Sequence, residues 1–423
     1  MVDWTSSMQQ TFEYYTVDPA TWKDDKKLDN VKSCTISRDS EVETLGSATI
    51  DVTESVGECY IRIYLVTIQN GLKEKHPLGT YLVQTPSSSY DGKVRNVSMD
   101  AYTPLLELKE NPPPLGYSIL KDGNIMDMAY RIAREHTRAP VAKTECAETL
   151  FNDFVSNTED TWLSFLIDLI ANAKHTFSLD ELGRVLFSPK QDTASLQPVW
   201  TYDDSNSSIL YPDMSMDHDL YGVPNVVEVI YSVGSDYFYS RVVNNDSNSP
   251  TSTINRGREI IHRVTNPEFV GTPTSKVSIC YEVKYNSDTG VFYRTGNILN
   301  IEDVPDGTLN EITDSGDTIY ITTKTSDLTD GTSRKEVVYY CAVKESLQIR
   351  EYAERLLREL STIEYTVSYS HGYCPVRIGD CVRLNYTKAG LTDVKAKVIS
   401  QSIKCEPGCP VSEKAVFTTK LWG

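Results

Sequence analysis

The chain lacks long hydrophobic runs and is poor in basic residues. None of its 423 residues belongs to an apolar stretch long enough to span a membrane, and residues 1–10 lack the basic-then-apolar pattern of a secretory leader. Lysine and arginine number 41 against 59 acidic residues, a net charge of −18. Because phosphates are held by Lys and Arg, a protein that wraps nucleic acid is excluded, whereas an acidic wall past which DNA slides is not. We therefore expect a soluble protein made in the cytoplasm.

Motifs of common enzyme classes are also absent. The sequence contains no HExxH zinc-protease motif, no GxSxG nucleophile elbow and no GxxxxGK[ST] phosphate loop. We therefore predict that the protein is not an enzyme, with no catalytic residue, no cofactor and no metal ligand. Its length is sufficient for two to four separate hydrophobic cores.

The nine cysteines form no recognisable metal motif. Only Cys374, Cys381, Cys405 and Cys409 lie close together, and their spacings differ from the CxxC knuckles of structural zinc sites. Buried free thiols are favoured over a disulfide, and a disulfide over zinc. All three states stay open at this stage.

Two acidic segments have the composition of a cation site. In Asp217–Asp219 two carboxylates flank an imidazole, but only Asp217 and Asp219 share a side of an extended strand. Asp246 and Asn248 match part of a calcium loop, which lacks its glycine and its distal glutamate. We predict a loop role for both segments.

Histidines and tyrosines are assigned structural roles. Cys374 lies three residues after His371, so a thiolate nucleophile would require both side chains to sit in a turn, and we predict no such role. His136, His175 and His262 lie in or beside regular elements, where a packing role is usual. The 26 tyrosines against 10 phenylalanines favour half-exposed β surfaces and protein contacts.

The stretch Trp162–Pro189 carries the clearest structural signal. Apolar residues recur at i, i+3, i+4 and i+7 from Trp162, which predicts an amphipathic helix capped by Asp160 or Thr161. The period then changes to that of a hairpin over His175–Ser188. A helix packed on a hairpin indicates a scaffold without catalytic chemistry.

Strand patterns dominate the rest of the chain. Residues 47–52 and 60–68 alternate apolar and polar side chains. Their predicted inward faces are Ala48, Ile50 and Val52, and Ile61, Ile63 and Leu65. Residues 76–79 predict a turn before a strand at 80–85. Short strands at near-regular spacing favour a small barrel or sandwich up to residue 108.

Prolines and predicted helices divide the chain after residue 108 into further segments. Pro112–Pro114 marks a boundary, because proline is excluded from helix interiors and central strands. A second helix is predicted over Asn124–His136, and with the helix and hairpin above it completes an α+β middle domain over residues 109–198. Strands resume at Val199, and a third helix is predicted over Glu345–Leu360.

Several short pieces occur in a fixed order along most of the chain. They are PLGTYLV from Pro77 and DAYTPLL from Asp100, TWL from Thr161 and LDELGRVLFSP from Leu179, DLYGVPNVVEV from Asp219, SPTS from Ser249 and GRE from Gly257, AERLL from Ala353, and VRIGDCV from Val376. In this combination the sequence resembles the bacteriophage tail hub proteins, the baseplate-hub family at the end of the tail tube.

The resemblance implies a mainly β fold with an α+β middle domain. Its parts are two tail-tube-like β-barrels, the helix-plus-hairpin domain and an inserted β-rich domain. Because the second barrel of such hubs is discontinuous, the expected boundaries are 1–108 for the first barrel, 109–198 for the middle domain, 199–264 with 361–423 for the second barrel, 265–344 for the insertion and 345–360 for a connecting helix. The resemblance gives the insertion no role.

The resemblance also implies partners in a virion tail. Three subunits of a homotrimer offer six barrels, which match the sixfold tail tube or distal tail protein hexamer and keep threefold symmetry for a spike, fibre or tail-tip protein. A tape-measure protein is a further implied partner, and DNA passes transiently through the lumen. With about three times 18 excess negative charges, we expect Asp and Glu to line that lumen. Acidity that only keeps the assembly soluble is the alternative.

The sequence therefore predicts a non-enzymatic structural hub that adapts tail symmetry and continues the lumen. One rival is a receptor- or carbohydrate-binding β protein of the tail tip. Another is a hub that carries cell-wall hydrolase activity. A binder should retain glycan as a monomer, and a hydrolase should clear a cell-wall suspension.

Overall fold

The computed structural model describes residues 2–54, 56–90, 92–93, 95–233, 236–267, 276–299, 307–327 and 333–422. The chain forms two compact units: unit 1 is Met1–Asp217 with Thr366–Phe417, and unit 2 is His218–Tyr365 with Thr418–Gly423. Strands dominate both units, which confirms the predicted mainly β class. No helix in the described ranges is long and apolar enough to cross a membrane.

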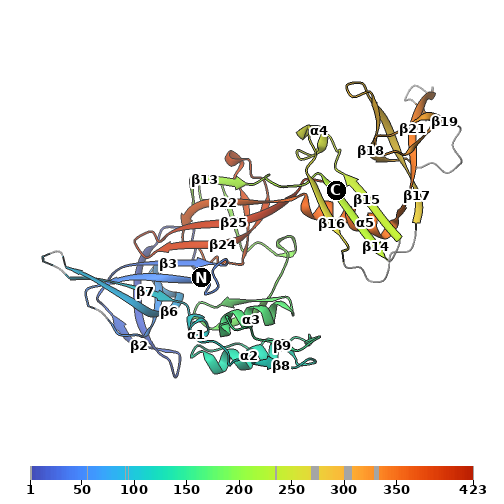
Figure 1. Cartoon of the computed structure of the whole chain (residues 1–423). Helices are drawn as coiled ribbons and strands as arrows, with labels where there is room; N and C mark the ends of the chain where they lie inside the picture. The colour runs from blue at the N-terminus through green and yellow to red at the C-terminus, as the bar shows by residue number, and fades with distance from the viewer. Residues whose placement is uncertain are drawn as a thin grey trace. The chain divides into compact units, whose positions relative to one another are not determined.

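Unit 1 is built on a 13-stranded sheet whose strands come from both ends of the chain. The early strands are β1 (Gln9–Asp18), β2 (Lys23–Leu28), β3 (Val31–Asp39), β4 (Gly46–Val52), β5 (Tyr60–Gln69), β6 (Leu72–Tyr90) and β7 (Arg95–Tyr102). The later strands are β12 (Trp200–Asp203), β13 (Leu210–His218), β22 (Thr362–Gly372), β23 (Cys381–Asn385), β24 (Val394–Lys404) and β25 (Pro410–Lys420). The main path runs β13-β22-β25-β24-β3-β4-β7-β6-β5-β1-β2, so the blue and red strands of Figure 1 meet where β3 pairs with β24.

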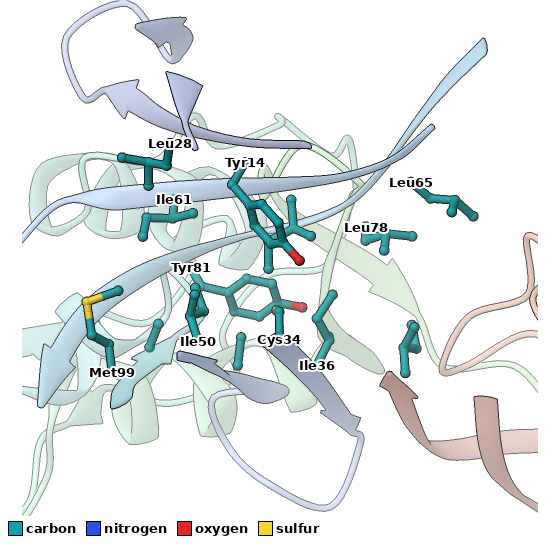
Figure 2. Close-up of a cluster of buried hydrophobic side chains, with 14 of the residues drawn as sticks. Tyr14, Leu28, Cys34, Ile36, Ile50, Ile61, Leu65, Leu78, Tyr81 and Met99 are labelled. Atoms are coloured by element: carbon teal, nitrogen blue, oxygen red, sulfur yellow. The ribbon is translucent and has the colours of Figure 1, made fainter. Parts of the chain in front are cut away.

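The core beneath the early strands follows the predicted alternation. The predicted inward residues are all 0–1% exposed: Ala48, Ile50, Val52, Ile61, Ile63 and Leu65. Burying each Ile or Leu side chain contributes about 1.5–3 kcal/mol, which makes this face the main source of local stability. Figure 2 shows Tyr14 and Tyr81 extending into the same cluster, near Cys34.

The predicted turn at residues 76–79 is wrong, because these residues lie inside β6. Pairing with β5 puts Ile63 opposite Gly79 and the next residue opposite Pro77, which leaves Leu78 as the extra residue of a β-bulge. Gly79 has φ of +152°, and a Cβ atom there would lie 2.6 Å from a buried tyrosine ring. Proline and glycine therefore mark a bulge here, where a ladder hydrogen bond is already interrupted.

Small helices and hairpins complete unit 1. They are α1 (Leu106–Lys109), β8 (Ser118–Ile119), α2 (Ile125–His136), β9 (Phe154–Val155), α3 (Trp162–Ala171), β10 (His175–Leu179), β11 (Val185–Pro189), η1 (Thr193–Ser195) and η2 (Thr387–Ala389). The predicted helix–hairpin stretch and the second predicted helix are confirmed by α3, β10–β11 and α2. Apolar residues of α1, α2, α3 and the hairpin share one core, including Ile125, Ala129, Phe165, Leu169 and Phe177.

The start of α3 is fixed by a capping box. The hydroxyl of Thr161 accepts a hydrogen bond from the backbone amide of Ser164 at 3.1 Å, and the Ser164 hydroxyl accepts one from the amide of Thr161 at 2.9 Å. We expect Thr161→Ala to lower the free energy of unfolding by about 1 kcal/mol, since one helix-end donor then loses its partner. Urea denaturation measures this against the exposed-site control Thr158→Ala, and equal effects of the two substitutions would contradict the assignment.

Unit 2 contains two sheets and a long helix. The first sheet has the order β15 (Asp236–Val243), β14 (Val226–Val233) and β16 (Ile261–Thr265), with α4 (Thr253–Arg256) between β15 and β16 in the chain. The helix α5 (Leu347–Leu360) packs on this sheet through Ile349, Ala353 and Leu357. The second sheet has the order β18 (Val291–Ile298), β17 (Lys276–Asn286), β21 (Ser333–Ser346), β20 (Thr318–Asp327) and β19 (Gly307–Ile312).

The structure divides the second half of the chain differently from the expected boundaries. The expected second barrel combines residues 199–264 with 361–423, but among the described strands β14, β15 and β16 pair only with one another. The reason is that α5 covers their apolar face, so these strands have a core of their own. Within the expected insertion, 265–344, the described strands form the second sheet of unit 2, and β21 continues into α5 at Ser346.

Candidate functional site

Within Asp217–Asp219, the side chains of His218 and Asp219 have separate structural roles. The ring of His218 stacks on the ring of Tyr365, with 4.7 Å between centroids. Asp219 accepts a hydrogen bond from the backbone amide of Tyr221 at 2.6 Å, which fixes a turn. In the described part of the chain, no group of three or more His, Cys, Asp or Glu side chains could hold a metal ion.

The other polar candidates also serve the backbone or the packing. Asp246 accepts a hydrogen bond from the amide of Asn248 at 2.8 Å, an Asx turn in an exposed loop. His136 stacks on Trp162 with 4.3 Å between ring centroids. The Nδ1 atom of His175 lies 2.6 Å from the carbonyl oxygen of Ala173. The nine cysteines are all free thiols.

His371 and Cys374 do come together, but inside a closed core. The Cys374 sulfur lies 4.0 Å from Nδ1 of His371, and Oε2 of Glu413 lies 3.4 Å from its Nε2. This order of thiol, imidazole and carboxylate is that of a cysteine hydrolase. However, the three residues are only 0–2% exposed, so a substrate has no access to the sulfur. The arrangement is therefore part of the core.

His371 and Glu413 belong to a row of polar side chains. This row crosses the pairing of β3 with β24, where early strands of the chain meet late ones. We call the β3–β24 pairing the seam. Arg38 on β3 lies opposite Gln401 on β24, 363 residues away, and Gln401 lies opposite Glu413 on β25. The next strand, β22, adds Tyr369 and His371. These five residues, one or two on each of four neighbouring strands, are the polar ladder.

Hydrogen bonds run along the whole polar ladder. Arg38 donates to Oε1 of Gln401 at 3.0 Å, and Gln401 donates to Oε2 of Glu413 at 2.6 Å. The hydroxyl of Tyr369 donates to Oε1 of Glu413 at 2.5 Å. Arg38 also donates to the carbonyl of Leu78 at 2.6 Å, in the bulge of β6. A one-residue slip of β24 would turn Gln401 out of this row, so the ladder specifies the register of the seam.

The carboxylate of Glu413 faces the imidazole of His371. Nδ1 of His371 lies 2.6 Å from the Gly372 carbonyl oxygen and Nε2 lies 3.4 Å from Oε2 of Glu413, so the ring can donate to both when it is doubly protonated. Burial alone would lower the pKa of His371, but its contacts with Cys374 and Glu413 raise that pKa to about 10. The hydroxyl of Tyr202 lies 3.0 Å from Nε2 and closes the cluster. Burial and Glu413 raise the pKa of Tyr369 well above its usual value.

A second joint attaches the helix–hairpin layer to the early strands. The carbonyl of Leu182, in the β10–β11 turn, accepts three hydrogen bonds. The donors are the indole of Trp22 at 2.8 Å, the hydroxyl of Thr80 at 2.9 Å and the guanidinium of Arg62 at 3.2 Å. Arg62 is 3% exposed and is also paired with Asp24 at 2.8 Å, so its buried charge is compensated. The turn of the predicted hairpin is thus a fixed attachment point.

Two shallow hollows lie on unit 1. The first, of about 440 Å³, is lined by Trp4, Ser6, Met8, Gln9, Gln10, Gly372, Tyr373, Pro407 and Gly408, none of them acidic or basic. The second, of about 530 Å³, is lined by five residues of β6 and β7 and, on β3 and β4, by Lys32, Ser33, Asp51 and Val52. The hydroxyl of Ser33 donates a hydrogen bond to the carboxylate of Asp51. Neither lining contains a histidine or a cysteine, and we take the sheet of unit 1 as the candidate functional surface.

Sequence reasoning missed Arg38, Gln401 and Glu413. Each is a polar residue in a strand, and its partners lie hundreds of residues away or across a strand pair. One signal was available: Gln401 and Glu413 stand where the inward-facing apolar residues of their strands would continue. A polar residue in an inward register indicates a buried hydrogen-bond network.

The fold defined by this sheet, its helix–hairpin layer and unit 2 is that of bacteriophage tail proteins. The structure is similar to a tail protein from Neisseria meningitidis, with a TM-score of 0.54 and 10% identity over 96% of this chain and 97% of that one. It is also similar to the 43-kDa tail protein of prophage MuSo2 from Shewanella oneidensis, with a TM-score of 0.53 and 10% identity over 96% and 98% of the two chains. No family model and no curated protein matches the sequence.

Proposed function

We propose that this chain is the structural hub of a phage tail baseplate or tail tip. The observation that carries the proposal is the continuous sheet of unit 1, in which the ends of the chain meet at the seam, within a fold shared with phage tail proteins over almost their whole length. In this role three copies close a ring, and each copy contributes two tube-like sets of strands, one on each side of the seam. Six such sets meet a sixfold tube or distal tail hexamer, and the threefold ring meets a spike, fibre or tail-tip protein.

The edges of the sheet support ring formation. Strands β2 and β13 end the main path, so each has one side without a partner strand among those described. Exposed strand edges are normally paired or covered. A closed ring of copies would cover the β2 edge and the β13 edge of every copy. β2 contains Lys23, Lys26 and Lys27 with two aspartates, a charge pattern that opposes indiscriminate edge pairing.

The charge of the chain suits a ring through which DNA moves. Acidic residues facing the threefold axis would repel phosphates at close range and leave DNA or a tape-measure protein free to slide. No catalytic step belongs to this role, which is purely geometric. In this role the protein acts as a component of the virion tail.

Light scattering of the protein, alone and then with tube protein present, tests the assembly. For the protein alone we expect a species of three times the 47.6-kDa chain mass at micromolar concentration. A monomer that retains glycan on an affinity column would instead favour the receptor- or carbohydrate-binding alternative. Clearing of a cell-wall suspension would favour a hub with hydrolase activity. Either of these results, without a trimer, would contradict the proposal.

The insertion gives a second prediction. Residues 265–344 contain described strands with a core of Tyr281, Val283, Ile319 and Cys341, separate from the core beneath α5. We expect that replacing 265–344 with a short Gly/Ser linker leaves the trimer and the melting of unit 1 unchanged. The measurement is light scattering with circular dichroism, beside the full-length chain. Loss of unit 1 on replacement would mean that these strands complete its core.

A further inference from the structure

Two cysteines face each other across the seam. The register of β3 and β24 pairs Ile36 with Ile403 and Thr35 with Lys404, and continuing it by one residue brings Cys34 opposite Cys405. The backbone amide of Cys405 donates to the carbonyl of Cys34 at 2.9 Å, as in a hydrogen-bonded antiparallel pair. Directly opposite Cα atoms of such a pair are about 5.5 Å apart, within the range that a disulfide requires.

Both side chains point into the same core. Cys34 shares the buried face of its strand with Ile36, and Cys405 packs against the same cluster. Cys34 is 4% exposed, whereas Cys405 is partly exposed and can be reached from solvent. The contact with the Cys405 thiol, together with burial, raises the pKa of Cys34 well above its usual value.

We propose that Cys34 and Cys405 are a site of oxidative modification, a disulfide that closes across the seam after the chain has folded. The oxidant is a small-molecule disulfide such as oxidised glutathione. The Cys405 thiolate attacks one glutathione sulfur and releases the first reduced glutathione. The Cys34 thiolate then attacks the Cys405 sulfur and releases the second. Two protein thiols and one glutathione disulfide thus become one protein disulfide and two reduced glutathiones.

Cys409 is the competing thiol. It lies in the same cluster and is 0% exposed, but its amide is bound to the Glu406 carbonyl at 2.8 Å in the turn after β24. It is therefore fixed by its own turn, and it has no opposite residue on β3. The cross-strand geometry favours Cys405 as the partner of Cys34.

This disulfide would hold the two sides of the seam together. It would join residues about 370 positions apart, so the early strands and the later strands could no longer separate on unfolding. The reduced seam suits assembly in a reducing compartment, and the oxidised seam suits a particle outside the cell. This inference adds a covalent state and does not depend on the oligomeric form of the protein.

Peptide mapping of the native full-length protein tests the proposal. The protein is incubated with oxidised glutathione at about pH 8.5, blocked with iodoacetamide, and digested with trypsin without reduction. We expect a linked pair of the peptides Ser33–Arg38 and Cys405–Lys414 that has lost two hydrogen atoms. Because the second peptide also holds Cys409, the link should persist in Cys409→Ser and disappear in Cys405→Ser.

The melting temperature distinguishes a disulfide across the seam from a disulfide between cysteines close in the sequence. The linked protein should melt about 5 °C or more above the reduced protein, and reduction with dithiothreitol should remove the difference. The Cys405→Ser variant, if folded by circular dichroism, should show no shift. A link that is lost in Cys409→Ser, glutathione retained on Cys405 as the end product, or thiols that stay free in the native protein would each overturn the proposal.

Discussion

Glu413→Gln is expected to lower the free energy of unfolding of unit 1 by about 3 kcal/mol or more. The carboxylate of Glu413 accepts from Gln401 at 2.6 Å and from Tyr369 at 2.5 Å, and it faces the imidazole of His371 at 3.4 Å. Glutamine has the same shape but replaces one acceptor oxygen by an amide NH2 group, which donates. In the place of Oε2 that group would meet the donating amide of Gln401, and His371 would lose the carboxylate whose contact raises its pKa.

Urea denaturation followed by fluorescence and circular dichroism measures this effect. Glu406→Gln is the matched control, because Glu406 is exposed on the turn that leads to the same strand. We expect the control to change stability by less than about 0.5 kcal/mol. If Glu413→Gln were as stable as the control, the polar ladder would not hold the seam.

Raising the pH from about 6.5 to 10 is expected to destabilise unit 1 through His371. The contacts of His371 place its folded pKa at about 10, above the ordinary value of 6.5. A group whose pKa is raised on folding contributes its full stability below the unfolded pKa and loses it as the pH rises through the folded pKa. Within this window the unfolding free energy should fall by up to about 1.4 kcal/mol per pH unit.

Comparing the pH profile of stability of a His371 variant with that of the wild type isolates the contribution of His371. We expect His371→Gln to be less stable than the wild type near pH 6.5 and to have a flatter profile up to pH 8.5. Below that pH the buried thiols contribute little, since burial and neighbouring groups raise the pKa of Cys34 and of Cys409 above their usual values. Parallel profiles of the variant and the wild type would show that His371 is not charged in the folded protein.

Local patterns predicted the elements of this fold well. The apolar stripe from Trp162 ends up buried in the middle core, and the alternation around Ile50 and Ile63 sets the inward faces of β4 and β5. These signals depend on neighbours in the sequence, so a single sequence contains them. The turn expected at 76–79 failed because proline and glycine mark β-bulges as well as turns.

Long-range pairing is what the sequence could not predict from its patterns. The seam joins β3 to β24, and nothing in the alternation of either strand names the other as its partner. For the same reason Arg38, Gln401 and Glu413 were not recognised as one network. The boundary of the second strand set was misplaced because β14–β16 have the same alternation whether α5 or another sheet covers them.

Negative-stain imaging of the purified protein tests the central proposal most directly. The account predicts class averages of a closed ring with threefold symmetry and an open centre, and capping of tube ends when tube protein is added. Particles that remain single chains, or rings of another symmetry, would contradict the role of the protein as a trimeric tail hub.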